Sequence, residues 1–198
     1  MQLLSALIPL ALATQVLGAS NPLEGRTLVT SQWEAEVTPG GGKVLLSGTI
    51  QEVHARLLEL NPNYDQDFPL KQPISPTLDK RTFFPADVRC DCQGRLAVIP
   101  SSGNGETALL RDIQMLRDIR NKIPTAPTGP GYCSRVSCSS GAAITWCNDN
   151  PKGKTLVSFG SVADGAQFIW GRCKTAGGVS GQVFHPTNWN VIVDKQKC

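Results

Sequence analysis

All seven cysteines of this chain lie at or beyond residue 90 of its 198 residues. This is the sharpest change in composition along the sequence. Disulfides stabilise small domains whose cores bury too little apolar area on their own. The distribution therefore predicts two unlike regions, the second of which is cross-linked through Cys90, Cys92, Cys133, Cys138, Cys147, Cys173 and Cys198.

The first 19 residues have the pattern of a secretory signal peptide. Residues 3–13 form an apolar core, and the polar pair Thr14-Gln15 is followed by small residues that end at Ala19. A helix that crosses a bilayer needs about 17–25 apolar residues, and Gln15 interrupts the run too early for that. We expect cleavage near Gly18 or Ala19, no membrane span, and a secreted, extracellular product.

Seven is an odd number, so one cysteine is either unpaired or joined to a second chain in a disulfide-linked dimer. The oxidising compartment favours disulfides for the others, whose pairing the sequence leaves open. Cys90 and Cys92 are two residues apart on one predicted strand and are poorly placed to bridge each other. One of these two is our candidate for the odd thiol. The spacings Cys-x-Cys, Cys-x₄-Cys and Cys-x₈-Cys match no common zinc pattern, so we expect neither a metal nor a cofactor.

Residues 20–81 are predicted to be a pro-region. They end in a proline-rich linker and the dibasic pair Lys80-Arg81. An extended backbone gives access to a kexin-type protease of the secretory pathway, although the pair is alternatively two solvated charges. The pro-region carries six Lys/Arg against eight Asp/Glu, whereas residues 82–198 carry thirteen against eight. An acidic pro-region that docks on a basic product is therefore a hypothesis.

The pro-region has predicted elements of its own. Residues 33–37 alternate like a strand, residues 39–42 make a turn, and residues 43–46 form a second strand. A helix is expected from Thr49, because Glu52 three residues later completes a capping box. Its apolar face consists of Ile50, Val53, Leu57 and Leu60, and it ends at Asn61-Pro62.

Residues 82–198 predict an α+β domain. Strands are expected at residues 86–92, 133–138, 142–147 and 189–193, with a tight hairpin turn at Ser139-Ser140-Gly141. Helices are expected at residues 106–123 and 161–173, the second with Ser161 as its N-cap. This order predicts a split β-α-β-β-α-β sandwich, in which two helices cover one face of an antiparallel sheet.

Catalytic patterns are weak in the cysteine-rich region. Its single histidine, His185, is expected in a surface turn. Ser134 with Asp149 or Asp164 would complete a Ser-His-Asp set, but no Gly-x-Ser-x-Gly turn is present. Glu106, the region's only glutamate, is explained by its place at a helix start. We expect no catalytic residues, and the scattered Lys and Arg predict no specific nucleic-acid partner.

Three tryptophans of the same region allow two interpretations. Trp146, Trp170 and Trp189 could line a ligand groove, but aromatic residues on strands and helices more often belong to the core.

Residues 133–150 read Cys-Ser-Arg-Val-Ser-Cys-Ser-Ser-Gly-Ala-Ala-Ile-Thr-Trp-Cys-Asn-Asp-Asn, and Val183-Phe-His and Trp189-Asn-Val-Ile-Val follow. With the signal, pro-region and dibasic architecture, these segments resemble small secreted cysteine-rich proteins of filamentous ascomycete fungi. Those proteins are candidate effectors without a settled biochemical activity. The element order also resembles the killer toxins encoded by viruses of smut fungi, in topology only, and topology does not give function.

These observations predict a protein that acts by binding, as a virulence effector at a host or as a toxin against competitors. Its target would be a host or competitor protein or cell surface that the sequence does not identify. Two alternatives come from other classes. One is a small secreted hydrolase or ribonuclease that uses His185, and the other is a cell-wall or spore-surface protein.

Overall fold

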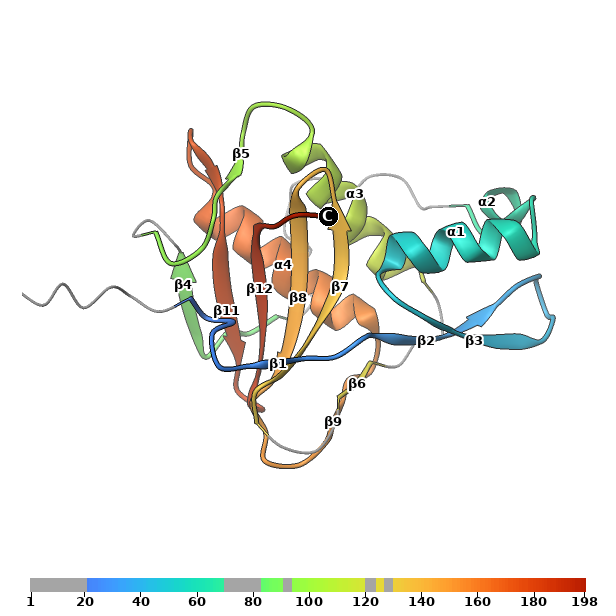
Figure 1. The fold of residues 1–198 in the computed structure, drawn as a ribbon, viewed down its shortest axis with the longest axis horizontal. Helices are drawn as coiled ribbons and strands as arrows, with labels where there is room; N and C mark the ends of the chain where they lie inside the picture. The colour runs from blue at the N-terminus through green and yellow to red at the C-terminus, as the bar shows by residue number, and fades with distance from the viewer. Residues whose placement is uncertain (1–20, 70–82, 91–93, 120–123, 127–129) are drawn as a thin grey trace, which may run out of the picture.

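The computed structural model describes residues 21–69, 83–90, 94–119, 124–126 and 130–198. Its centre is a six-stranded sheet in the order β1-β7-β8-β12-β11-β4 (Figure 1). The strands are β1 (Thr27–Leu28), β4 (Asp87–Cys90), β7 (Tyr132–Ser139), β8 (Ala142–Asn148), β11 (Gly181–His185) and β12 (Trp189–Lys195). β1 is parallel to β7, and the other neighbours are antiparallel. Together with the helices, this sheet confirms the expected α+β class.

β7 and β8 form the hairpin that the sequence predicts. Ser140 and Gly141 connect them with φ angles of 48° and 81°. Two successive positive φ angles are typical of the type I′ turn, whose twist matches that of the flanking strands. The register of the pair shifts between Arg135 and Ser137, where β7 contains a bulge. The predicted strands and turn are therefore confirmed, with Ser139 as the last residue of β7.

Two long helices cover one face of the sheet (Figure 1). α3 (Gly105–Asp118) packs on β7 and β8, and α4 (Phe159–Cys173) packs on β11 and β12. Leu109, Ile113 and Leu116 of α3 are buried, and residues 120–123 of the predicted helix lie outside the described residues. The predicted N-cap Ser161 is wrong. Ser158 is the residue with extended backbone before α4, and buried Phe159 already belongs to the first turn.

β11 is a strand that the sequence analysis did not predict. It lies between β4 and β12, so the cysteine-rich region contributes five strands to the main sheet instead of the expected four, and β1 adds a sixth. The first residue of β11 is Gly181, and glycine inside a strand weakens the local strand pattern. A Cβ there would lie 3.0 Å from Ile169 and 3.1 Å from the sulfur of Cys173. The glycine therefore allows the strand to approach α4 closely.

Two short strand pairs lie outside the main sheet. β5 (Ile99–Pro100) pairs with β10 (Gly178–Val179), and β6 (Thr125–Ala126) pairs with β9 (Lys154–Thr155). Each pair joins two connections that are far apart in the sequence.

Residues 21–69 contribute β1, a hairpin and two helices. The hairpin pairs β2 (Gln32–Glu36) with β3 (Lys43–Ser47), and α1 (Ile50–Leu60) is followed by the short α2 (Tyr64–Asp67). The predicted capping box is present, because Thr49 Oγ1 accepts from the Glu52 N–H and Glu52 accepts from the Thr49 N–H. Three of the four expected apolar residues are buried, whereas Leu60 is 43% exposed.

One large apolar core extends through both regions. Trp33, Ile50, Val53 and Leu57 belong to the same buried cluster as the inner faces of α3, α4 and the sheet. A smaller cluster on the opposite face of the sheet consists of Leu96, Cys133, Cys147 and Ile192. Within the described residues, no helix is both long and apolar enough to cross a bilayer.

Three disulfides cross-link the cysteine-rich region. Cys90 with Cys173 joins β4 to α4, Cys133 with Cys147 joins β7 to β8, and Cys138 with Cys198 joins β7 to the C-terminus. The predicted cross-linking of this region is thus confirmed for six of its seven cysteines. Cys92 is the one cysteine outside these bridges, and it lies outside the described residues. None of the bridges reaches residues 21–69.

Candidate functional site

The candidate functional site is the junction at which residues 21–69 meet the cysteine-rich region. β1 adds a parallel strand to β7 there. The Thr27 N–H donates to the Gly131 carbonyl at 2.9 Å, and the Val29 N–H donates to the Cys133 carbonyl at 2.8 Å. β1 therefore pairs with backbone groups that an uncovered edge strand would leave open to other chains.

An aromatic pair forms the apolar centre of the junction. The rings of Trp33 and Phe159 are stacked, with centroids 3.8 Å apart and planes inclined by 14°. The side chains are 0% and 1% exposed, so each ring excludes water from the other. The indole N–H of Trp33 donates to the Gly48 carbonyl at 2.7 Å, which satisfies its one polar atom. Trp33 thus joins the β2–β3 hairpin to the first turn of α4.

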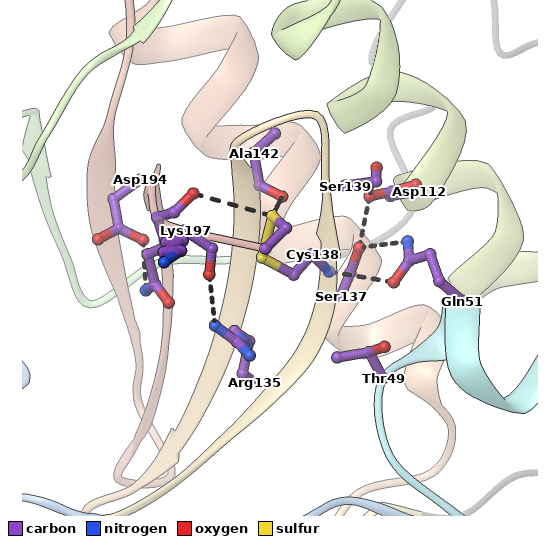
Figure 2. The surroundings of a disulfide bond; sticks show 12 residues. Thr49, Gln51, Asp112, Arg135, Ser137, Cys138, Ser139, Ala142, Asp194 and Lys197 are labelled. Carbon is purple, nitrogen blue, oxygen red and sulfur yellow. Dashed lines mark hydrogen bonds between the residues drawn. A yellow bond between two sulfur atoms is a disulfide. The ribbon is translucent and has the colours of Figure 1, made fainter.

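A buried polar network joins α1 to the sheet and to α3 (Figure 2). The Gln51 amide donates to Ser137 Oγ at 3.0 Å and accepts from the Cys138 N–H at 3.1 Å. Ser137 and Ser139 both donate to Oδ2 of Asp112, at 2.5 and 2.7 Å. Burial raises the pKa of Asp112, and these hydrogen bonds partly oppose that shift. Gln51 is therefore the contribution of α1 to a network centred on a carboxylate of α3.

A second polar chain crosses the other face of the sheet. Arg26 Nη1 lies 2.5 Å from Asp149 Oδ1, and the Asn190 amide donates to the other oxygen of Asp149. Asn190 in turn accepts from Gln182 at 3.0 Å. In this ion pair residues 21–69 supply the cation and the cysteine-rich region supplies the anion. This polarity is opposite to the net charges on which the docking hypothesis was based.

A cleft of about 590 Å³ lies along the junction. Leu28 and Glu52 line it from the first region, and Arg135, Thr145 and Gln196 line it from the cysteine-rich region. Hydrogen bonds from Thr49 lower the pKa of Glu52, and the charge of Arg135 adds to this shift. The cleft therefore presents both signs of charge together with hydroxyl and apolar groups, and both regions form its walls.

His185 lies at the end of β11 among aromatic rings. It stacks on Trp189 with ring centroids 4.7 Å apart, and its ring centroid lies 5.5 Å from that of Phe83 in an edge-to-face arrangement. Burial lowers the pKa of His185, and Lys154 adds to this shift. His185 is half-buried and is the last residue of β11, next to the turn at residues 186–188 rather than in it. The signal that could have revealed this is Trp189, four residues later on the neighbouring strand.

The other residues considered for catalysis have partners of their own: Ser134 bonds to Ser31, Asp149 to Arg26, Asp164 to Arg117, and Glu106 to Lys174 and Trp170. None of these contacts includes His185, so the structure does not bring the considered set together. The hydrogen bonds from Lys174 and Trp170 lower the pKa of Glu106, while burial opposes them.

Trp146 and Trp189 are 2% and 3% exposed and belong to the core, whereas Trp170 is half-buried and donates to Glu106. The core interpretation therefore holds for two of the three tryptophans. Among the described residues, no three His, Cys, Asp or Glu side chains are grouped as metal ligands would be.

Comparisons with protein-family models, with curated proteins and with solved structures find no match to this chain. The predicted signal peptide and the predicted processing site at Lys80 and Arg81 lie outside the described residues.

Proposed function

We propose that this chain is the precursor of a secreted, disulfide-stapled fungal protein that acts by binding. A kexin-type protease would cut the backbone after Arg81, between the pro-region and residues 82–198. The matured protein would then act as a virulence effector at a host or as a toxin against competitors. The fungal assignment and the choice between these roles rest on the resemblance of residues 133–150, 183–185 and 189–193 to effector-like proteins.

The observation that carries the proposal is the placement of the disulfides. The three bridges join strands, a helix and the C-terminus within the cysteine-rich region, and none involves residues 21–69. A cut between the two regions would therefore leave every described cross-link intact. This is the arrangement that a protein needs if it is to be processed during export and remain folded outside the cell.

Mass spectrometry of the exported protein, with and without reduction, tests the maturation. We expect a polypeptide that begins at Thr82 and gains the mass of six hydrogens when its three disulfides are reduced. Free thiols at all cysteines in a folded product would contradict the proposal. A covalent dimer would show that the odd cysteine joins a second chain.

The binding role is tested by applying the purified protein to host tissue and to competing microorganisms. The response should persist in the His185→Ala variant, because the proposal assigns no chemistry to this ring. Loss of the response, in a variant that keeps its native circular dichroism and its disulfides, would favour the hydrolase or ribonuclease alternative.

A further inference from the structure

We propose that residues 21–69 remain bound to the cysteine-rich region after the cut, so that the mature protein consists of two chains from one precursor. This inference rests on the proposed cleavage after Arg81. The binding partner of the cysteine-rich region is thus another segment of the same precursor. Because the segment contains no cysteine, the association would be entirely non-covalent.

The cysteine-rich region would expose core surface if the segment left. Phe159 would lose the stacked ring of Trp33, and β7 would lose the strand that pairs with it. Contacts of α1 with β7 and α3 would also be lost, together with the buried side chains of Ile50 and Val53. Apolar surface and an open strand edge both favour reassociation.

The released segment would have little structure of its own. It would keep a single two-stranded hairpin and an 11-residue helix, without a cross-link. Isolated two-stranded hairpins and helices of this length are marginally stable in water. Its apolar residues are buried in a core that is largely made by the other region. Both fragments therefore reach their folded state by staying together.

Polar contacts at three separate places make the association specific. Arg26 binds Asp149, Ser31 bonds to Ser134, and Gln51 bonds to both Ser137 and the Cys138 backbone. Ser134 and Ser137 are 5% and 0% exposed. A different occupant of this surface would have to supply the same hydrogen bonds or leave buried polar groups unpaired, which is costly.

The test uses the whole precursor, purified uncut from a secretory host that lacks the processing protease. It is cut in solution with a kexin-type protease and passed over a size-exclusion column at concentrations from micromolar to nanomolar. We expect both fragments to elute together in equal amounts and to separate only in denaturant. Separate elution at micromolar concentration would overturn the inference.

A precursor that resists the kexin-type protease would contradict the proposed maturation instead. A second precursor, with the recognition sequence of another protease inserted after Arg81, then decides the association by itself. Fragments of this precursor that elute together support the association, and fragments that elute apart overturn it.

Matched variants test whether the contacts described here hold the fragments together. Trp33→Ala should weaken the association at least about thirtyfold, because buried aromatic anchors dominate interfaces. Gln51→Ala, which leaves the core intact, should weaken it about tenfold. Leu45→Ala is the control, since Leu45 is 68% exposed on the same hairpin. Equal affinities of all three variants would overturn the inference.

Discussion

The two regions of this molecule share one core but are held in different ways. The cysteine-rich region has three disulfides, most of the sheet and both long helices. Residues 21–69 have no cross-link and only small elements, and they are fixed by what they touch. The disulfides thus stabilise the cysteine-rich region directly. They stabilise residues 21–69 only indirectly, because that segment is folded only while the cysteine-rich region is folded. Perturbations of the two regions should therefore have different consequences.

Removal of a disulfide should have the largest effect, and its size should follow the length of chain that the bridge closes. The bridge of Cys90 with Cys173 spans 83 residues and that of Cys133 with Cys147 spans 14. Chain entropy gives about 4.5 and about 3 kcal/mol for loops of these lengths. Paired alanine substitutions, compared by urea unfolding, should show this order. The reverse order would mean that loop entropy does not govern stability here.

Trp33→Ala should destabilise the protein by about 4 kcal/mol, because it removes a fully buried ring from the junction. Leu45→Ala should change the free energy of unfolding by no more than about 0.5 kcal/mol, since its side chain faces solvent. Limited proteolysis of the Trp33 variant should release residues 21–69 before it cuts the cross-linked region. Simultaneous loss of both regions would show that they unfold as one unit.

Asp194 should make stability depend on pH. It is 4% exposed, and burial raises its pKa from 3.8 to about 6, while a hydrogen bond from Gln196 and the charge of Arg135 partly oppose the shift. Between these two values the folded state binds more protons than the unfolded state. The free energy of unfolding should therefore fall as the pH rises from about 4 to about 6, by at most about 3 kcal/mol.

The Asp194→Asn variant should lose most of this dependence and be more stable than the parent at about pH 7. Part of the pH dependence should remain in this variant, because burial also raises the pKa of Asp112. Asp87→Asn is the control, because the Asp87 side chain is 52% exposed. Urea unfolding at several pH values measures all three. An unchanged slope in Asp194→Asn would refute the assignment.

The ion pair between Arg26 and Asp149 should have the smallest effect. Its side chains are 18% and 27% exposed, so solvent weakens the attraction, and we expect a coupling of about 1 kcal/mol or less. A double-mutant cycle with Arg26→Met and Asp149→Asn isolates this energy. The coupling should decrease at high salt. A much larger value would make electrostatics, rather than apolar packing, the main link between the regions.

Elements with a strong local pattern could be predicted from the sequence. The β7–β8 hairpin has alternating apolar residues and a suitable turn, and α1 has its capping box. β1 has neither, because Thr27 and Leu28 are exposed and their strand exists only through pairing with β7. Such an element is determined by tertiary contact, so no local signal identifies it.

The candidate site was less predictable for the same reason. Asp112 interrupts the buried face of α3, between Leu109 and Ile113, and a carboxylate in that position was a readable sign of a polar partner. The partners of Asp112 could not be predicted from the sequence, because Ser137 lies on a distant strand and Gln51 on another helix. The sequence also contained no sign that the junction's ion pair would oppose the net charges of the two regions.

The bulge between Arg135 and Ser137 determines which way the end of β7 faces. With the extra residue, Cys138 lies opposite Ala143 and Ser137 lies opposite Ile144. If the strand kept Val136 but alternated regularly, without a bulge, the two sides would be exchanged, because side chains alternate at every step. Cys138 would then point toward the helices, out of reach of Cys198, and Ser137 would turn away from Asp112. The bulge thus sets the positions of the C-terminal tether and the carboxylate network together. Deletion of Val136 should preserve both, because Ser137 would then follow Arg135 directly and stay opposite Ile144.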